Sequence, residues 1–195
     1  MIASIILSAG DSRRMGQPKA LLPYNGNCFL DKIISDYSSL SCQPIIVVLG
    51  KDVDLIESGL QDQLHKVMIN SRPELGPLSS LKVGLSGLLP ENEGCFFHPV
   101  DHPVVKVETL KNVITAWNTN PAKAVRPRYN RRGGHPVLIG SEWIQPILDL
   151  PPQANMRDLM HSRSEDVIEL EVSDPGVILN IDTPEQYHEL LANAT

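Results

Sequence analysis

The chain has 195 residues, of which 42% are hydrophobic and 21% charged, a composition that excludes wholesale disorder and suits a single α/β domain. Its formal net charge of −6 argues against a broad nucleic-acid-binding surface, because duplex affinity comes mainly from cations that neutralise phosphates. The 3 cysteines have no CxxC spacing, which argues against a disulfide framework or a zinc ribbon. No apolar run reaches the length of a membrane span, so we expect a cytoplasmic protein with no membrane partner.

The basic residues are concentrated in two short windows. Residues 11–20 carry +2 and residues 123–132 carry +5, so the remainder of the chain carries −13. Clustered cations in an otherwise acidic chain indicate local anion-binding segments, which would suit small phosphorylated ligands.

Short β-rich runs alternate with amphipathic stretches through the first part of the chain. The run 2–9 is almost continuously apolar, as expected of a strand that is covered on both faces. The pattern predicts strands at 2–9, 44–50, 66–70 and 94–100, and helices at 29–40, 54–64, 78–89 and 107–117. Such βα units favour a largely parallel sheet.

The alternation changes after the helix at 107–117. Two strands, at 122–125 and 135–139, are joined by a basic connector that contains glycine. Helices are predicted at 142–148, 156–163 and 185–193, and strands at 167–172 and 177–181. Thr183 is the expected N-cap of the last helix, with Pro184 in its first turn. Nothing in the sequence divides the chain, so we expect one domain spanning residues 1–195.

The first strand runs directly into a loop that ends at Lys19. Small residues at the end of a strand let backbone N–H groups approach a ligand closely, and Arg14 and Lys19 follow at a distance that suits phosphates. The spacing of Gly10 and Gly16 matches neither a Walker A loop nor G-x-G-x-x-G. On local grounds an ordinary strand-to-helix turn with solvated arginines stays open.

Two aspartates are candidate metal ligands. Asp101 follows the strand at 94–100, and a carboxylate there lies over the crevice where open α/β sheets bind ligands. Mg²⁺ commonly takes one or two protein carboxylates, so Asp182 could share the ion, with Asn180 as an auxiliary ligand. Three alternatives stay open: Asp101 capping a turn, Asp182 capping a helix, or a transition-metal site made by His98, Asp101 and His102.

The basic connector contains Arg126, Arg128, Arg131 and Arg132 without an acidic residue. Like charges at this density repel one another unless an anion is present, so the segment suits a phosphorylated substrate. A surface hairpin rich in arginine is the alternative.

Five motifs in order resemble the MobA-like NTP transferases, and within them the molybdenum cofactor cytidylyltransferase branch. Residues 7–23 match L-A-A-G-x-S-x-R-M-G-x-x-K-x-L-L-P except at Ser8. The other four are residues 76–85 (G-x-x-x-S-L-x-x-G-L), 99–103 (P-x-D-x-P), 134–137 (G-H-P-V) and 182–185 (D-T-P-E).

The resemblance implies a three-layer Rossmann-like fold of the nucleotide-diphospho-sugar transferase type, with a mostly parallel sheet and a small β-hairpin subregion. It implies a Mg²⁺-dependent nucleotidyltransferase in which Arg14, Lys19 and Asp101 are catalytic and Asp101 and Asp182 bind the metal. The implied nucleotide-binding residues are Leu7, Ser8, Ala9, Gly10, Ser12, Arg14, Lys19, Ser80 and Leu81. The implied acceptor-binding residues are Arg132, Gly134, His135 and Pro136.

The resemblance also implies the substrates. Ala9 is similar to the cytidine-selecting form, because a methyl group narrows the base site against a purine, so we expect CTP rather than GTP. The acceptor would be molybdenum cofactor (molybdopterin), and a molybdenum hydroxylase such as a xanthine dehydrogenase would receive the product. Alternatives are a molybdenum cofactor guanylyltransferase, a sugar-phosphate or polyol-phosphate nucleotidyltransferase, and a nucleotide-binding regulatory module without catalysis. A dinucleotide-dependent oxidoreductase would lack its G-x-G-x-x-G loop.

Overall fold

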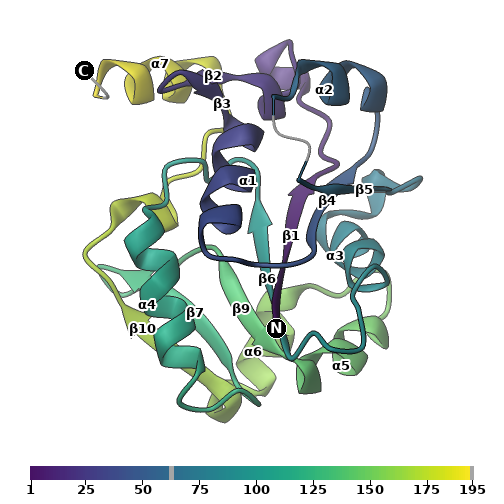
Figure 1. Cartoon of the computed structure of the whole chain (residues 1–195), viewed down its shortest axis with the longest axis vertical. Helices are drawn as coiled ribbons and strands as arrows, with labels where there is room; N and C mark the ends of the chain where they lie inside the picture. Colours follow the sequence, from purple (N-terminus) through teal and green to yellow (C-terminus); the bar gives the residue numbers. More distant parts are fainter. Residues whose placement is uncertain (62–63, 194–195) are drawn as a thin grey trace.

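The computed structural model of the protein describes residues 1–61 and 64–193, apart from the side chain of Arg13 (Figure 1). The central sheet has the strand order β10-β7-β9-β6-β1-β4-β5, and β8 pairs with β7. Its strands are β1 (Ile2–Ser8), β4 (Ile45–Leu49), β5 (Lys66–Ile69), β6 (Gly94–Pro99), β7 (Ala124–Tyr129), β8 (Arg132–Gly133), β9 (Val137–Gly140) and β10 (Val167–Glu171). A small separate ribbon is formed by β2 (Pro23–Tyr24) and β3 (Asn27–Cys28).

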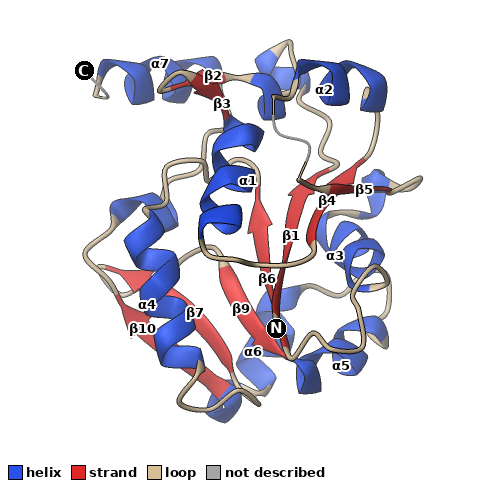
Figure 2. Cartoon of the chain, viewed as in Figure 1, coloured by secondary structure: helices blue, strands red, loops and turns tan. Residues whose placement is uncertain are grey.

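Helices cover both faces of the sheet (Figure 2). They are α1 (Phe29–Ser39), α2 (Val53–Gly59), α3 (Pro77–Leu85), α4 (Val107–Trp117), α5 (Ile144–Leu148), α6 (Met156–Ser162) and α7 (Pro184–Ala192). The buried apolar side chains of α1 and α4 belong to one core, and those of α3 and α5 to another on the opposite face. The three-layer α/β architecture with a mostly parallel sheet is therefore confirmed.

The strand β1 lies at the centre of this arrangement. It pairs in parallel with β4 on one side and with β6 on the other. Successive side chains enter the two different cores, Ile5 on one face and Ile6 on the other, which explains the continuous apolar run. Because β4 and β6 lie on opposite sides of β1, the chain reverses direction across the sheet here, and a crevice opens at the carboxyl ends of β1 and β6.

The prediction of a strand at 177–181 is wrong. A 3-10 helix occupies Pro175–Ile178, because Pro175 fixes the first turn and the buried carboxylate of Asp174 accepts a hydrogen bond from the Gly176 N–H at 2.9 Å. The chain after this helix still reaches the sheet, since the Ile181 N–H donates to the Asp101 carbonyl at 2.8 Å. The segment thus reaches the end of β6 without being a strand.

Two predicted helices are longer than the structure shows. The helix expected at 78–89 ends at Leu85, after which the Asn92 side chain accepts a hydrogen bond from the Leu89 N–H at 2.9 Å. The helix expected at 54–64 ends at Gly59, and residues 62–63 of that prediction lie outside the described residues. The helix α4 has the predicted bounds. Within the described part of the chain, every helix is too short or too polar to span a bilayer.

The last helix begins as predicted, with Thr183 as its N-cap. The Thr183 hydroxyl accepts from the Gln186 N–H, and the Gln186 side chain accepts from the Thr183 N–H, which forms a capping box. Tyr187 anchors the helix by donating from its hydroxyl to the Pro23 carbonyl at 2.7 Å. Since Thr183 supplies the cap, the carboxylate of Asp182 is left available to point elsewhere.

Candidate functional site

A cleft of about 1320 Å³ opens at the carboxyl ends of β1 and β6. Every residue that the resemblance assigns to the nucleotide, to catalysis or to the metal lines it. These are Leu7, Ser8, Ala9, Gly10, Ser12, Arg14, Lys19, Ser80, Leu81, Asp101 and Asp182. Residues separated by up to 175 positions in the sequence are thus gathered at one edge of the sheet.

The loop after β1 is held by Ser12. The Ser12 hydroxyl accepts a hydrogen bond from the Lys19 N–H at 3.1 Å, and its carbonyl accepts from the Met15 N–H at 2.9 Å. Gly16 has a φ of +69°, a left-handed conformation that costs glycine little. The loop therefore bends back on itself and carries Lys19 into the cleft, where its side chain is only 15% exposed.

Asp101 is held in place through its backbone. The neighbouring Val100 N–H donates to the Leu7 carbonyl at 3.0 Å, and the Asp101 carbonyl accepts from the Ile181 N–H at 2.8 Å. A turn closed by the His102 N–H and the Pro99 carbonyl, at 3.1 Å, surrounds it. These contacts place Asp101 between the loop after β1 and the segment that leads to Asp182.

Lys19 contacts both aspartates. Its Nζ lies 2.5 Å from Oδ1 of Asp182 and 3.7 Å from Oδ2 of Asp101. The guanidinium of Arg14, which is 69% exposed, lies 3.7 Å from Oδ1 of Asp182. The hydrogen bond from Lys19 is the main reason that the pKa of Asp182 lies below its ordinary value, and both cations add to the effect. The predicted phosphate-binding cations and the predicted metal ligands are therefore one ionic cluster.

The two carboxylates fit a magnesium ion. Oδ1 of Asp101 is buried and has no hydrogen-bond partner within the described residues, and the Nε2 of His102 is 4.0 Å away, too far for a hydrogen bond. No group of three or more His, Cys, Asp or Glu side chains that could enclose a metal occurs in the described ranges. Mg²⁺ needs only one or two protein carboxylates, with phosphate and water oxygens completing its shell.

The alternative transition-metal site does not form. His98 is buried, and its two ring nitrogens lie within hydrogen-bond distance of the Tyr37 hydroxyl and the His102 carbonyl, at 3.0 and 2.9 Å. It therefore has no free nitrogen for a metal. Asn180 does not lie on a strand, and its side-chain amide donates to Oδ2 of Asp182 at 2.9 Å.

Two further histidines meet in the lining of the cleft, one of them next to Asp101 in sequence. The rings of His102 and His135 lie 5.1 Å apart, and both residues line the cleft. Burial lowers the pKa of His102 and, with help from His102 and Arg126, lowers the pKa of His135 to about 3. Both imidazoles are therefore neutral near pH 7, and within the described residues the Nδ1 atom of each is buried without a hydrogen-bond partner.

Asn70 lines the cleft, although the sequence did not predict it as a site residue. Its buried side-chain amide donates to the hydroxyls of Ser79 and Ser80, at 2.8 and 3.0 Å, which ties the end of β5 to the first turn of α3. Its position could have indicated a ligand-binding role, because Asn70 lies at the end of a predicted strand, as Asp101 does. Three more missed residues, Ala154, Asn155 and Met156, line the cleft where the predicted helix at 156–163 begins.

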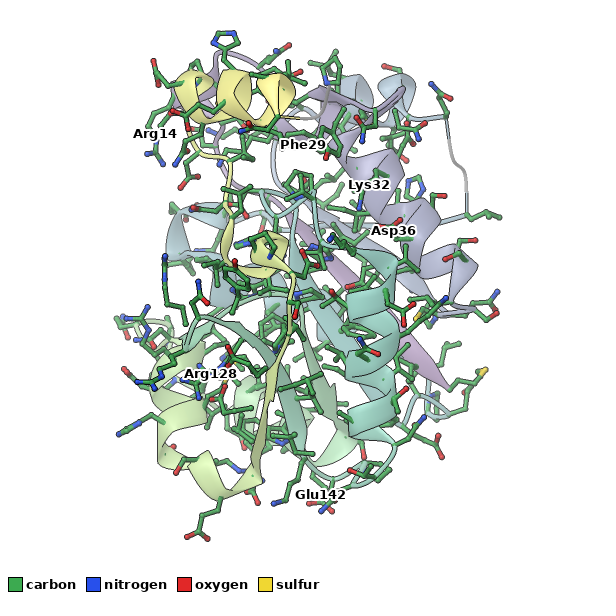
Figure 3. The ribbon with its side chains drawn as sticks, turned by 90° about the vertical axis from the view of Figure 1, so that its left-hand side faces the viewer. Arg14, Phe29, Lys32, Asp36, Arg128 and Glu142 are labelled. Atoms are coloured by element: carbon green, nitrogen blue, oxygen red, sulfur yellow. The ribbon has the colours of Figure 1, made fainter. Side chains whose placement is uncertain are left out.

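The basic connector is partly neutralised by an acidic strand. Glu169 of β10 accepts hydrogen bonds from Arg126 and lies 3.7 Å from Arg128, and Glu171 accepts from the Arg131 N–H. Arg126 and Arg128 therefore have an acidic partner, since parallel pairing of β7 and β10 brings Glu169 alongside. Arg14 and Arg128 lie at separate places on the molecule (Figure 3).

Of the four predicted acceptor-binding residues, only His135 is in the lining of the cleft. Arg132, three residues before His135, is exposed but does not line the cleft. Gly134 and Pro136, on either side of His135 in sequence, do not line it either. Gly134 is closely packed, since a Cβ there would lie 2.2 Å from the Val177 carbonyl oxygen. Gly134 and Pro136 therefore lie where they can shape the backbone on either side of His135.

Comparison with known proteins places the chain among nucleotidyltransferases. It is 28% identical over 188 residues to the molybdenum cofactor cytidylyltransferase of Escherichia coli K12, covering 95% of this chain and 93% of that protein. It is 29% identical over 157 residues to a probable molybdenum cofactor guanylyltransferase of Rhodopirellula baltica, covering 80% of this chain and 70% of that protein.

A solved structure has the same fold. The crystal structure of Rv0371c from Mycobacterium tuberculosis H37Rv aligns with a TM-score of 0.84 at 27% identity, covering 98% of this chain and 97% of that one. The pattern of one family, the MobA-like NTP transferase domain, matches residues 4–167, which is more than half of the chain. The protein therefore belongs to the MobA-like NTP transferase family.

Proposed function

We propose that the protein is a Mg²⁺-dependent nucleotidyltransferase that moves CMP from CTP onto a phosphorylated acceptor of the molybdopterin type. The observation that carries the proposal is the ionic cluster of Lys19, Asp101 and Asp182 in the lining of the cleft. A binding module needs cations for a triphosphate, but it does not need two carboxylates aimed at the same point.

The reaction fits the charges in the cleft. An acceptor phosphate oxygen attacks the α-phosphorus, a new P–O bond forms, and the bond to the β-phosphate oxygen breaks to release pyrophosphate. Such a transfer depends on in-line positioning and charge neutralisation more than on a protein nucleophile. Lys19 and Arg14 would hold the triphosphate and neutralise charge on the departing pyrophosphate. Asp101 and Asp182 would hold Mg²⁺, which supplies Lewis-acid neutralisation of phosphate oxygens when bound.

The choice of CTP rests on Ala9. Its side chain is buried in the lining of the cleft. If the base lies there, the methyl group would narrow the space against a purine. The relative with the longer match is named a cytidylyltransferase, and the other a probable guanylyltransferase, so the base must be measured. A xanthine dehydrogenase-type recipient and a cytoplasmic location stay predictions.

The test measures pyrophosphate release with molybdopterin, Mg²⁺ and each of the four NTPs in turn, alongside thermal stabilisation by the same nucleotides. We expect CTP to give the fastest release and the largest stabilisation, since a ligand that binds the folded state raises its stability. Asp101→Asn should abolish release while leaving the melting temperature close to that of the wild type. Unchanged turnover in this variant would contradict the metal assignment, and stabilisation without release would favour the regulatory module.

A further inference from the structure

His98 makes two hydrogen bonds from inside the core. It lies in β6, three residues before Asp101, with its side chain buried on the face covered by α1. Its Nε2 is 2.9 Å from the carbonyl oxygen of His102, and its Nδ1 is 3.0 Å from the hydroxyl of Tyr37 on α1. The Tyr37 and His98 rings meet edge to face at 88°.

The chemistry of the partners determines which atoms donate. A carbonyl oxygen can only accept, so Nε2 of His98 carries the hydrogen that points at His102. Burial holds the pKa of His98 well below its ordinary value, so the ring is neutral and has one N–H. Nδ1 is then the acceptor for the Tyr37 hydroxyl. Both nitrogens are occupied, and the tautomer and orientation of the ring are set.

We propose that His98 is a positioning residue that sets the direction of the Asp101 carboxylate by holding the carbonyl of His102. The turn from Pro99 to His102 has Asp101 at its third position and is closed by the His102 N–H to the Pro99 carbonyl. The hydrogen bond from Nε2 of His98 holds the carbonyl group of His102. The proposal rests on the proposed function, in which Asp101 holds the metal.

The surroundings of His98 explain why this role falls to a polar side chain. Phe96, two residues earlier on the same strand face, is fully buried in the core that also contains Tyr37, and its ring lies 5.2 Å from that of Tyr37. An apolar residue at position 98 could fill this space but would leave the buried His102 carbonyl without its donor. The turn could then relax, and a displacement of about 1 Å at a reacting centre can cost about 100-fold in rate.

Two variants separate positioning from packing. In His98→Gln the side-chain amide reaches the place of Nε2 and keeps a donor for the His102 carbonyl. In His98→Asn the shorter amide reaches only the place of Nδ1, so it keeps the Tyr37 contact and loses the one to the turn. Phe96→Leu is the matched control, because it removes buried aromatic packing beside Tyr37 and touches neither hydrogen bond of His98.

Three properties are measured on the full chain: kcat and KM for CTP, the melting temperature, and the affinity for Mn²⁺ alone, read by electron paramagnetic resonance. We expect His98→Asn to lower kcat by about 10- to 100-fold with KM for CTP nearly unchanged, and to weaken Mn²⁺ binding. His98→Gln should recover most of both losses. Phe96→Leu should lower the melting temperature at least as much as His98→Asn while keeping kcat and Mn²⁺ affinity near wild type.

Two results would overturn the proposal: His98→Asn performing as well as His98→Gln, or Phe96→Leu losing kcat and Mn²⁺ affinity to the same degree as His98→Asn. The proposed function fails separately, if wild-type protein releases no pyrophosphate with any NTP. In that case Mn²⁺ affinity in the same three variants still decides whether His98 positions Asp101.

Discussion

Lys19 donates a hydrogen bond to Oδ1 of Asp182 at 2.5 Å, across 163 positions of sequence. The cation proposed to hold the triphosphate and a carboxylate proposed to hold the metal therefore neutralise each other. If nucleotide and metal bind as proposed, both groups would have to change partners: Lys19 would contact phosphate oxygens, and Asp182 would contact the metal.

Replacement of Lys19 by methionine tests this exchange. Lys19→Met removes the cation that competes for Asp101 and Asp182, so Mn²⁺ should bind the nucleotide-free protein about fivefold more tightly, as expected for a partly exposed ion pair. Nucleotide transfer should nevertheless fall by about 100- to 1000-fold, because charge on the departing pyrophosphate loses its stabilisation. Mn²⁺ titration and pyrophosphate release measure the two effects. Lys111→Met, on an exposed side chain of α4, is the control, and unchanged Mn²⁺ affinity in Lys19→Met would contradict the exchange.

Ala9→Gly tests the choice of base. Removal of the methyl group from the cleft should move the ratio of kcat/KM for CTP over GTP toward GTP by about tenfold, the usual size of a one-carbon difference in a pocket. The ratio is measured by competition between the two nucleotides. Ala154→Gly makes the same change elsewhere in the lining and should leave the ratio alone. Equal shifts in both variants would show that general loosening, not Ala9, controls selectivity.

His135 makes the folded state sensitive to acid. Its folded pKa of about 3 lies below the ordinary 6.5, so as the pH falls below 6.5 the unfolded chain takes up a proton before the folded protein does. The contribution of His135 to the free energy of unfolding is therefore fully present above about pH 6.5, and it declines as the pH falls toward 3. Between about pH 7 and about pH 5, wild type should lose about 1 to 2 kcal/mol more than His135→Gln in urea denaturation.

His98 and His102 are present in both proteins, so the difference between the two proteins reports His135 together with its effect on the neighbouring His102. The same urea series at about pH 8 serves as the control, because His135 is neutral there in both the folded and the unfolded state. A parallel decline of the two proteins below about pH 6.5 would contradict the burial of His135 as a neutral ring.

Asp174 should stabilise the fold without touching the cleft. Its buried carboxylate accepts hydrogen bonds from the Lys106 N–H, the Thr109 hydroxyl and the Gly176 N–H. Asp174→Asn replaces an acceptor by a donor amid these groups and should cost about 2 to 4 kcal/mol of unfolding free energy. Urea denaturation measures the loss, and Asp149→Asn, at an exposed position, should change stability by less than about 0.5 kcal/mol. Equal stabilities of the two variants would refute the structural role.

The sequence alone was sufficient for features that depend on neighbours in the chain. The apolar run of β1, the helical spacing of α4 and the cap at Thr183 are local patterns, and their elements appear where those patterns predicted them. The small residues and cations after β1, and Asp101 after β6, were identified as ligand-binding candidates because the ends of parallel strands meet at one edge of a sheet. The wrong prediction of a strand at 177–181 shows the limit of such patterns. The side chain of Asp174 and the ring of Pro175 favour a 3-10 helix there, despite the strand preference of the β-branched residues that follow.

Tertiary structure alone decided which charges meet. The arginines of β7 and the glutamates of β10 are about 40 positions apart, and only their pairing shows that Arg126 and Arg128 have an acidic partner in Glu169. Only the folded chain shows that Lys19 lies between Asp101 and Asp182, or that His98 supports the turn beside them. The physical reason is one of range: periodicity and capping act within a few residues, whereas hydrogen bonds and ion pairs across the sheet depend on how distant segments pack.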